Sequence, residues 1–432
     1  MDAEQIKWIF YSMPVCLVLT FWLFRKAREG SRKRALAEQL SAGADEPASL
    51  HPYIELHKCL GCGSCVSACP EGNVLGVIEG KSQLINPSHC IGHGACKAAC
   101  PVDAIKLVFG TATRGVDIPM VQPSFETNVP GIFIAGELGG MGLIRNAVEQ
   151  GRQAMESIIK RGRGKAEFDV AIIGAGPAGF SASLAAHDKG LKYLTLEQES
   201  LGGTVFHFPR GKIVMTQPMN LPTIGKIRIR ETSKEALLEF WQDVERKSGV
   251  RIRYNERMES IDPCPEGYRI TTNRGSYTVH SILLSIGRRG SPRKLDVPGE
   301  ELSKVVYRLT DPEQYRQQKV LVVGGGDSAL EAATSIADVP GTTVTLSYRG
   351  DSFSRAKEKN RQRVETAQQN GRLQVLLNSN VREIFPDRAT IDHAGELVEI
   401  RNDAVIISAG GVLPTPMLKK LGIHVETKFG TE

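Results

Sequence analysis

Cysteines gathered in one short block are the residues of this chain best suited to chemistry. Seven of the nine cysteines lie between Cys59 and Cys100, whereas Cys16 and Cys264 stand alone. Secreted disulfide scaffolds spread cysteine pairs through a short chain, but a dense block with fixed short spacings indicates metal ligands and thiols that stay reduced. The sequence therefore predicts a metal-binding region in residues 51–110.

The first part of the block has the spacing of an iron–sulfur motif. It reads C-x2-C-x2-C-x3-C-P, with thiols at Cys59, Cys62, Cys65 and Cys69. Short loops let one segment place three thiolates around one cube of iron and sulfide, and the fourth thiolate of such a run normally binds a second cube. A second run repeats the spacing with a histidine in place of its second cysteine, and its candidate ligands are Cys90, His93, Cys96 and Cys100.

Two such runs about thirty residues apart resemble a bacterial dicluster ferredoxin domain. The resemblance implies two ligand sets: Cys59, Cys62, Cys65 and Cys100 for one 4Fe-4S cluster, and Cys69, Cys90 and Cys96 for part of a second. His93 is a candidate fourth ligand, because a neutral imidazole can bind iron and would raise the cluster's potential. The alternatives are a three-iron or empty second site without His93, or a structural zinc site, whose cysteine pairs are usually more widely separated.

A glycine-rich turn follows a predicted strand at residues 168–173. The stretch FDVAIIGAGPAG contains Gly174, Gly176 and Gly179, and it leads into a predicted helix, a second strand YLTL and then Glu197. The glycines permit a tight turn and close approach to a pyrophosphate, the helix N-terminus stabilises its charge, and the acid binds a ribose diol. The complete unit predicts a dinucleotide-binding site.

A second unit, KVLVVGGGDSA, places Gly324, Gly326 and Ala329 between a predicted strand and a predicted helix. No acid stands at the end of its next strand, where Arg349 is found instead, and Arg355 follows six residues later. An acid would repel the 2′-phosphate of NADPH, whereas an arginine can pair with it. The sequence therefore favours NADPH over NADH, and the alternative is that both arginines are only solvated.

Two such units, the acid-bearing one first, resemble the thioredoxin-reductase-like flavoproteins over about residues 111–432. In that family the first unit binds FAD, the second binds NADPH, and a closing segment of the form T-x-x-P-G-I-F-A-A-G-D returns to the flavin. Here the matching segment, Thr127–Glu137, precedes the first unit, and it has Gly136 followed by Glu137 in place of the aspartate. We therefore predict a circular permutation, which is tolerated where chain ends are exposed and close together.

The N-terminal region predicts a membrane anchor. Residues 8–24 are seventeen uncharged residues with aromatic side chains at both ends, which is the short limit for a membrane-spanning helix. Six basic residues follow between Arg25 and Arg34, so the positive-inside rule predicts a single pass through the inner membrane with the catalytic domains in the cytoplasm. The same run matches the net charge of +6, so no nucleic-acid surface is needed. The alternatives are a buried helix or a signal peptide, although a signal peptide is basic before its apolar stretch.

Together these segments predict an α/β fold with two Rossmann-like dinucleotide-binding domains, a small α+β dicluster ferredoxin domain and one N-terminal transmembrane helix. A length of 432 residues allows two or three domains. The predicted divisions are 1–50 for the anchor and a polar linker beginning at residue 35, 51–110 for the ferredoxin domain, 111–165 for the permuted segment of the FAD domain, 166–299 for the FAD domain, 300–412 for the NADPH domain and 413–432 for a return toward the FAD domain.

Disulfide reductases of this superfamily pass electrons to a cysteine pair, which this chain lacks. No cysteine follows closely after Glu197, none precedes Gly324 closely, and Cys264 is unpaired. The stretch VVYRLTDPEQYRQQKVLVVGGGDSALEAA resembles ferredoxin–NADP reductases of the thioredoxin-reductase type, and YRGDSFS resembles bacillithiol disulfide reductases.

The resemblance implies an oxidoreductase that moves electrons between NAD(P)H, FAD and iron–sulfur clusters, to or from an external carrier such as a quinone, a cytochrome or a ferredoxin. Flavin reduction of a small disulfide is the alternative enzyme function, and a redox-sensing or assembly protein with structural cofactors is the alternative outside catalysis. No side chain is predicted as a catalytic acid, base or nucleophile, since positioning and cofactor tuning suffice. Members of the family often form homodimers.

Overall fold

The structure is a computed structural model that divides into two compact units, Met1–Arg114 with Phe429–Glu432, and Gly115–Lys428. It describes residues 3–41, 47, 50–90, 92–113, 115–140, 142–208, 210–215, 218–229, 231–288, 290–354 and 356–431.

The first unit holds the cysteine block between two short antiparallel strand pairs. Strand β1 pairs with β4, and β2 pairs with β3. The elements after the N-terminal helix are β1 (His51–Ile54), α2 (Ser64–Ala68), β2 (Leu75–Ile78), β3 (Lys81–Leu84), η1 (Pro87–His89), α3 (Ala95–Ala98) and β4 (Ile105–Val108). A small core of cysteine and aliphatic side chains, which includes Cys65, Leu75, Cys96 and Ile105, lies between them. Because so small a lobe can bury little apolar surface, the cysteines themselves form much of its interior.

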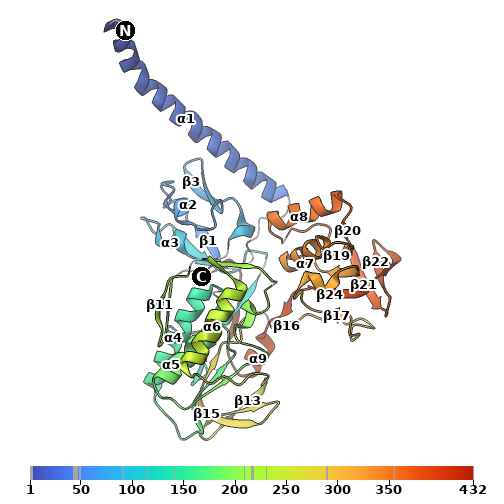
Figure 1. The fold of residues 1–432 in the computed structure, drawn as a ribbon. Coiled ribbons are helices and arrows are strands. Elements are labelled where there is room, and N and C mark those ends of the chain that lie inside the picture. Colours follow the sequence, from blue (N-terminus) through green and yellow to red (C-terminus); the bar gives the residue numbers. More distant parts are fainter. Residues whose placement is uncertain are drawn as a thin grey trace. The chain divides into compact units, whose positions relative to one another are not determined.

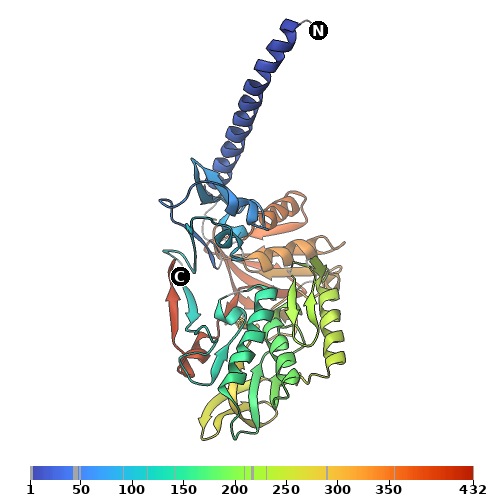
Figure 2. The same ribbon diagram turned by 90° about the vertical axis from the view of Figure 1, so that its left-hand side faces the viewer.

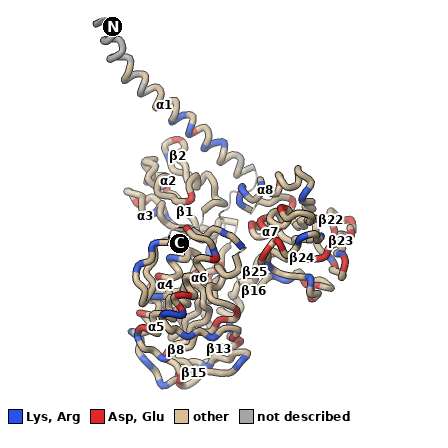
Figure 3. Tube along the Cα trace, viewed as in Figure 1, with Lys and Arg blue, Asp and Glu red and all other residues tan. Residues whose placement is uncertain are grey.

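Helix α1 (Ala3–Ser41) is a single long helix drawn in dark blue in Figure 1. It therefore continues through residues 35–41, which we had predicted to begin a linker; the remaining linker residues 42–46, 48 and 49 lie outside the described residues. Its C-terminal half contacts the β2–β3 hairpin, where the Arg32 guanidinium donates to the Val77 carbonyl at 3.2 Å and Lys33 pairs with Glu79 at 2.7 Å. Figure 3 shows the basic residues that line this part of α1.

The predicted membrane-spanning segment, residues 8–24, falls within α1. Most side chains between residues 8 and 18 lie outside the described set, whereas Phe21, Trp22, Leu23 and Phe24 are described and exposed. Across the described residues, no helix is both long enough and apolar enough to cross a membrane.

The second unit begins with a mixed sheet of six strands. Its order is β13-β14-β15-β7-β8, with β6 also paired to β15. Strands β6, β15, β7 and β8 run parallel, and β13 and β14 form an antiparallel meander with β15. The bounds are β6 (Ile132–Ile134), β7 (Phe168–Ile173), β8 (Tyr193–Leu196), β13 (Met258–Cys264), β14 (Gly267–Thr272) and β15 (Ser276–Leu284). The parallel strands are rich in apolar residues, and most of these residues are buried, as expected where both faces of a parallel sheet are covered.

Helices α4 (Ile144–Arg161), α5 (Pro177–Asp188) and α6 (Lys234–Ser248) belong to this first sheet. Figure 1 shows α4 and α5 side by side, and they make the most extensive contact between any two described elements. The helix α6 begins at a Ser233 cap, whose hydroxyl accepts from the Ala236 amide at 3.1 Å, and it ends at Gly249 in the left-handed conformation. The strands β9 (Ile213–Met215), β10 (Met219–Leu221), β11 (Gly225–Ile227) and β12 (Glu231–Ser233) form two small pairs before α6.

The segment that we predict to be permuted contributes a strand to this sheet. Strand β6 pairs in parallel with β15 in the register Ile282↔Ile132, although these two partners are 150 positions apart in the sequence. At the other end of the unit, β26 (Val425–Lys428) pairs antiparallel with β5 (Val116–Pro119). Figure 2 shows red β26 beside blue-green β5. Strand β26, after which a relative would continue into its closing segment, therefore lies beside β5, the first strand of the predicted permuted segment 111–165.

The second nucleotide-binding region is a five-stranded parallel sheet of order β17-β24-β18-β19-β20. Its strands are β17 (Val305–Val306), β18 (Lys319–Val323), β19 (Thr343–Ser347), β20 (Leu373–Leu376) and β24 (Ala404–Ile407), with helices α7 (Asp327–Ala337) and α8 (Glu358–Gln369). An antiparallel sheet of β21 (Ser379–Ile384), β22 (Arg388–His393) and β23 (Glu396–Arg401) packs beside it through a shared core. A short pair, β16 (Ser291–Pro292) with β25 (Gly411–Val412), connects the two regions, and α9 (Thr415–Lys420) returns to the core of the first sheet.

Candidate redox centres and nucleotide sites

The first four predicted ligands line one cavity. Cys59, Cys62, Cys65 and Cys100 surround it, so three ligands come from the first motif and one from the second. Backbone amides of nearby segments donate hydrogen bonds to two of these sulfurs. The Ser82 amide lies 3.4 Å from Cys59 Sγ, and the Ala104 amide lies 3.3 Å from Cys100 Sγ. Such bonds stabilise thiolate charge and tune the potential of a cluster held there.

A second cavity collects the other predicted ligands. Its lining includes Cys69, Cys90, His93 and Cys96, together with Glu71 and mainly apolar neighbours. Cys69 comes from the first motif and the other three from the second, so the two cavities exchange one ligand each. This is the crossed arrangement that the ferredoxin resemblance implied, and the donor set of each cavity, with its dominant thiols, fits an iron–sulfur cluster.

Burial makes several of the ligand thiols harder to deprotonate before any metal binds. It raises the pKa of the Cys96 thiol to about 11, and it also raises the pKa values of Cys65 and Cys90. A hydrogen bond with Ser64 lowers the pKa of Cys62. Since metals bind thiolates, cluster assembly must displace protons from the buried sulfurs. In the described part of the chain, no three His, Cys, Asp or Glu side chains are arranged to hold a single metal ion.

The first glycine-rich loop has the close approaches that a dinucleotide fold requires. Gly174 has a φ of +98°, and a Cβ there would lie 2.7 Å from the Ser285 carbonyl oxygen. A Cβ on Gly179 would lie 1.8 Å from the Gly174 carbonyl oxygen, so only glycine lets α5 begin against the loop. Gly176 is the N-cap of α5. The structure therefore brings these three predicted residues together at the end of β7.

Glu197 lies at the end of β8 and faces the same loop. Its carboxylate accepts hydrogen bonds from the Ala175 amide at 2.7 Å and from the Glu199 amide at 2.9 Å. Burial raises the pKa of Glu197, and these two amide bonds oppose that effect. A buried carboxylate beside the pyrophosphate loop is suited to bind the ribose hydroxyls of a dinucleotide.

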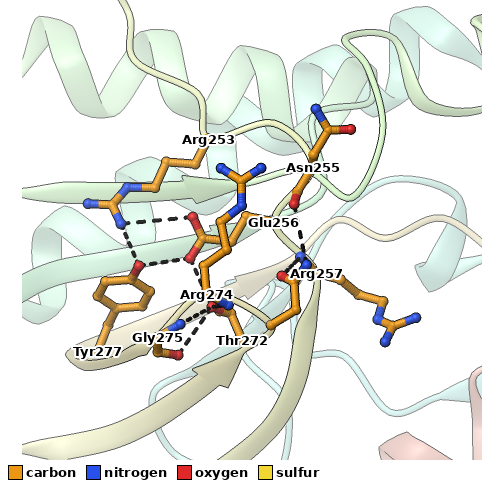
Figure 4. A network of polar contacts seen from close by, with 9 residues as sticks. Arg253, Asn255, Glu256, Arg257, Thr272, Arg274, Gly275 and Tyr277 are labelled. Carbon is orange, nitrogen blue, oxygen red and sulfur yellow. Dashed lines mark hydrogen bonds and ion pairs between the residues drawn. The ribbon is translucent and has the colours of Figure 1, made fainter.

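A buried polar network holds the backbone on the far side of Glu197. The Glu256 amide donates to the Glu197 carbonyl at 3.0 Å, and the Glu197 amide donates to the Arg253 carbonyl at 2.9 Å. Figure 4 shows the Glu256 carboxylate accepting from Thr272 and Tyr277 at 2.9 and 2.8 Å. Sequence reasoning missed this network, because it depends on pairing between β8, the 253–256 segment and the β14–β15 meander.

The permuted segment reaches the same loop. Gly136 has a φ of +82°, its amide donates to Gln150 Oε1 on α4 at 2.8 Å, and a Cβ there would lie 3.0 Å from Ala178 Cβ. Glu137 follows in the short 3₁₀ helix η2 (Glu137–Gly139) and is half-buried. The structure thus places Gly136 beside the N-terminus of α5.

The second glycine-rich loop has a similar construction at the end of β18. Gly324 has a φ of +143°, Gly326 is the N-cap of α7, and Ala329 is fully buried in the first turns of that helix. Arg349 follows β19 and is exposed, whereas Arg355 lies outside the described residues.

Two residues beside this loop were not predicted. The Tyr348 ring covers Gly325, since a Cβ on that glycine would lie 2.3 Å from the ring. Asp327 accepts from the Lys357 amide at 2.8 Å and from the Asn360 side chain at 2.7 Å, which joins the starts of α7 and α8. Neither contact can be predicted from residue spacing in the sequence, because each joins separate elements of the fold.

Comparisons with known proteins agree with this geometry. A family described as pyridine nucleotide-disulphide oxidoreductase matches residues 171–430, and one described as a 4Fe-4S dicluster domain matches residues 51–101. The ferredoxin–NADP reductase of Ignicoccus hospitalis is 30% identical over 271 residues, which are 60% of this chain and 83% of that protein. The bacilliredoxin reductase Bdr of Bacillus subtilis is 25% identical over 266 residues, covering 60% of this chain and 82% of its own.

A solved structure supports the same fold. The bacillithiol disulfide reductase of Bacillus cereus is 26% identical, with a TM-score of 0.53 over 60% of this chain and 82% of that chain. The first family covers more than half of the chain, and the matched residues include both glycine-rich loops described above. The protein is therefore an FAD- and NAD(P)H-dependent member of the pyridine nucleotide-disulphide oxidoreductase family that also carries a 4Fe-4S dicluster domain.

Proposed function

We propose that the protein moves electrons between NAD(P)H, FAD and its own iron–sulfur clusters, and between those clusters and an external redox partner. The observation that carries the proposal is the pair of four-ligand cavities in a chain that also has both nucleotide loops. FAD supplies the link, since it exchanges electron pairs with a nicotinamide and single electrons with clusters. The external partner is a ferredoxin, a quinone or a cytochrome.

The residues of the chain position the cofactors and do not act as acids or bases in this proposal. Gly174, Gly176 and Gly179 admit the FAD pyrophosphate to the α5 N-terminus, and Glu197 holds the ribose. Gly136 and Glu137 close the flavin side of the same site. These roles need only the contacts already present in the folded chain, so no catalytic residue is assigned.

We propose NADPH as the preferred nicotinamide donor, with NADH as the weaker one. Gly324, Gly326 and Ala329 form its pyrophosphate loop, and Arg349 with Arg355 would pair with the 2′-phosphate. The exposed position of Arg349 directly after β19 supports this role, because the second strand of such a fold ends beside the adenosine ribose. No acidic residue stands between Ser347 and Gly350 to oppose it.

Anaerobic titration with NADPH tests the main proposal. We expect the flavin absorbance to bleach first and cluster EPR signals to appear as further NADPH is added. A Cys59→Ser variant should keep flavin bleaching and lose the signal of the first cluster, which separates the two cofactors. If NADPH bleaches the flavin but neither cluster gains an electron, even with mediators present, the proposed electron path is wrong.

A second candidate function is reduction of a small disulfide at the flavin. The similarity to a bacilliredoxin reductase and a bacillithiol disulfide reductase favours it, and an exogenous disulfide would replace the cysteine pair that this chain lacks. Steady-state rates with low-molecular-weight disulfides and with one-electron dyes distinguish the candidates. Rates with dyes alone support the electron-transfer proposal, and rates with disulfides alone support the second one.

We also propose that α1 attaches the protein to the cytoplasmic face of the inner membrane. The exposed side chains Phe21, Trp22, Leu23 and Phe24 precede the basic run, and anionic lipid headgroups attract such a run. Extraction of native membranes separates the cases: high salt releases a peripheral protein, and only detergent releases an integral one. Recovery entirely in the soluble fraction at low salt would contradict the attachment.

A further inference from the structure

The two ligand loops have the same backbone conformation. In the first, Gly61 and Gly63 flank Cys62 with φ values of +66° and +79°, and α2 begins directly afterward. In the second, Gly92 and Gly94 have φ values of +75° and +73°, and α3 begins directly afterward. The residue between the second pair of glycines is His93, so it holds the same place in its loop as Cys62 holds in the first.

Close packing explains why both loops need their first glycine. A Cβ on Gly61 would lie 2.0 Å from the Gly80 carbonyl oxygen, and a Cβ on Gly92 would lie 2.6 Å from the Leu50 carbonyl oxygen. Each loop is therefore pressed against a neighbouring backbone segment. The second loop has the same close backbone packing although its central residue is a histidine. This similarity indicates that the loop holds the His93 side chain as the first loop holds that of Cys62.

The side chains that line the second cavity indicate which of them is the fourth iron ligand. His93 is half-buried and lines it together with Cys69, Cys90 and Cys96. The other side chain in that lining able to bind iron is Glu71. Imidazole suits iron bound among thiolates, whereas a carboxylate suits harder cations. Glu71 also lies in the turn after Cys69, whereas His93 lies in the loop that corresponds to the loop of Cys62.

We propose that the second cluster is a 4Fe-4S cluster held by Cys69, Cys90, Cys96 and His93. The neutral imidazole leaves this cluster one unit less negative than its all-cysteine neighbour, and lower negative charge raises the reduction potential. The second cluster is therefore the one that is reduced first. This inference rests on the proposed function only in that both require clusters in the chain.

Isotope labelling tests the ligand directly. The full chain is prepared with ¹⁵N-histidine, reduced with dithionite to bypass NADPH and flavin, and examined by pulsed EPR. A strong nitrogen coupling that changes from the ¹⁴N to the ¹⁵N pattern, on the cluster reduced first, supports the proposal. The absence of any histidine nitrogen coupling on either reduced cluster overturns it.

Matched variants test the potential. His93→Cys should retain the iron of two four-iron clusters, lose the nitrogen coupling and shift the oxidised-to-reduced ratio of the second cluster at least tenfold, about 59 mV downward for one electron. Glu71→Gln should leave coupling and potential unchanged. The proposal fails if His93→Cys leaves the potential of both clusters where it was, or if Glu71→Gln removes the cluster. Since dithionite supplies the electrons, a failure of NADPH to reduce the clusters would sink the proposed function and leave this inference intact.

Discussion

At the scale of single residues, the carboxylate that we predict to bind the FAD ribose, Glu197, is held in place by the folded chain itself. Its side chain accepts from two amides of the surrounding loops, and its own amide and carbonyl are bonded to the 253–256 segment. The buried Glu256 carboxylate anchors that segment through two hydroxyls. We therefore predict that Glu256 is a positioning residue that acts on the FAD site through the Glu197 backbone.

Replacement of Glu256 by Ala should loosen FAD binding. Thr272 and Tyr277 both donate to the same carboxylate oxygen of Glu256, so alanine leaves two hydroxyls without their acceptor, and loss of such a buried partner costs about 1–3 kcal/mol. We expect a lower Tm and a lower ratio of FAD to protein after gel filtration, measured by flavin absorbance. Thr272→Val removes one of the same hydrogen bonds and should give a smaller loss in the same direction. Full FAD retention in Glu256→Ala, with normal affinity by fluorescence titration, would show that the network supports only stability.

Replacement of Arg349 by Gln should discriminate between the two nicotinamide donors. A charge-assisted bond to phosphate contributes about 1.5–3 kcal/mol, so KM for NADPH should rise roughly tenfold to a hundredfold while KM for NADH stays nearly constant. Stopped-flow bleaching of the flavin measures both. The control is Arg401→Gln, an exposed arginine at the end of β23, which should change neither value. An equal loss with NADH and NADPH would indicate that Arg349 does not contact the 2′-phosphate.

At the scale of elements, the sequence was informative wherever local geometry demanded a particular residue. Glycine-rich turns, the acid after β8 and the cysteine spacings each follow from rules within one segment, so the position of each loop between its flanking elements could be predicted. The binding roles of these residues stay predictions. The antiparallel meander, the Glu256 network and the Ser82 contact with Cys59 depend on segments far apart in sequence, which no local pattern encodes. Likewise, the extent of α1 was misjudged at residues 35–41, because its polar end reads as a linker and its contacts with the β2–β3 hairpin were not visible.

The crossing of α4 and α5 gives an element-scale prediction. A Cβ on Gly151 would lie 2.0 Å from the Ala178 carbonyl oxygen, so Gly151→Ala must push the helices apart. The adjacent Gln150 accepts from the Gly136 amide, and the displacement should disturb the closing side of the FAD site. We expect a destabilisation of about 1–3 kcal/mol and reduced FAD occupancy, measured by thermal unfolding and flavin absorbance.

Gly30→Ala provides the matched helical control for Gly151→Ala. A Cβ on Gly30, within α1, would have no atom within 4 Å, and alanine favours a helix over glycine. This variant should therefore be neutral or slightly more stable, with unchanged FAD content. Equal behaviour of the two variants would mean that the α4–α5 approach is not tight in solution.

At the scale of the whole molecule, the order of segments joins the ferredoxin unit directly to the segment that we predict closes the FAD site. Only Arg114 and Gly115 mark the junction between the two units, and β5 begins at Val116. In an unpermuted relative, the same closing segment would end the chain and leave no such connection. If residues 115–165 close the flavin site as we predict, the segment at that site is also the one joined covalently to the unit that holds the cluster ligands.

Restoring the family's order should yield a working reductase without the clusters. Lys428 and Val116 are partners at one end of the antiparallel β26–β5 pair, so a two-residue Asn-Gly turn can join them. The new ends would fall in the exposed stretch after α4, at residues 161–165. A chain of residues 166–428, this turn and residues 116–165 should fold, bind FAD and be bleached by NADPH at the rate of the full protein. It should contain no iron, and its electron transfer to one-electron acceptors should depend on the flavin alone.

Failure of this chain to bind FAD, when the full protein does, would mean that the ferredoxin unit is needed to complete the flavin site and that the two units do not fold as separate bodies.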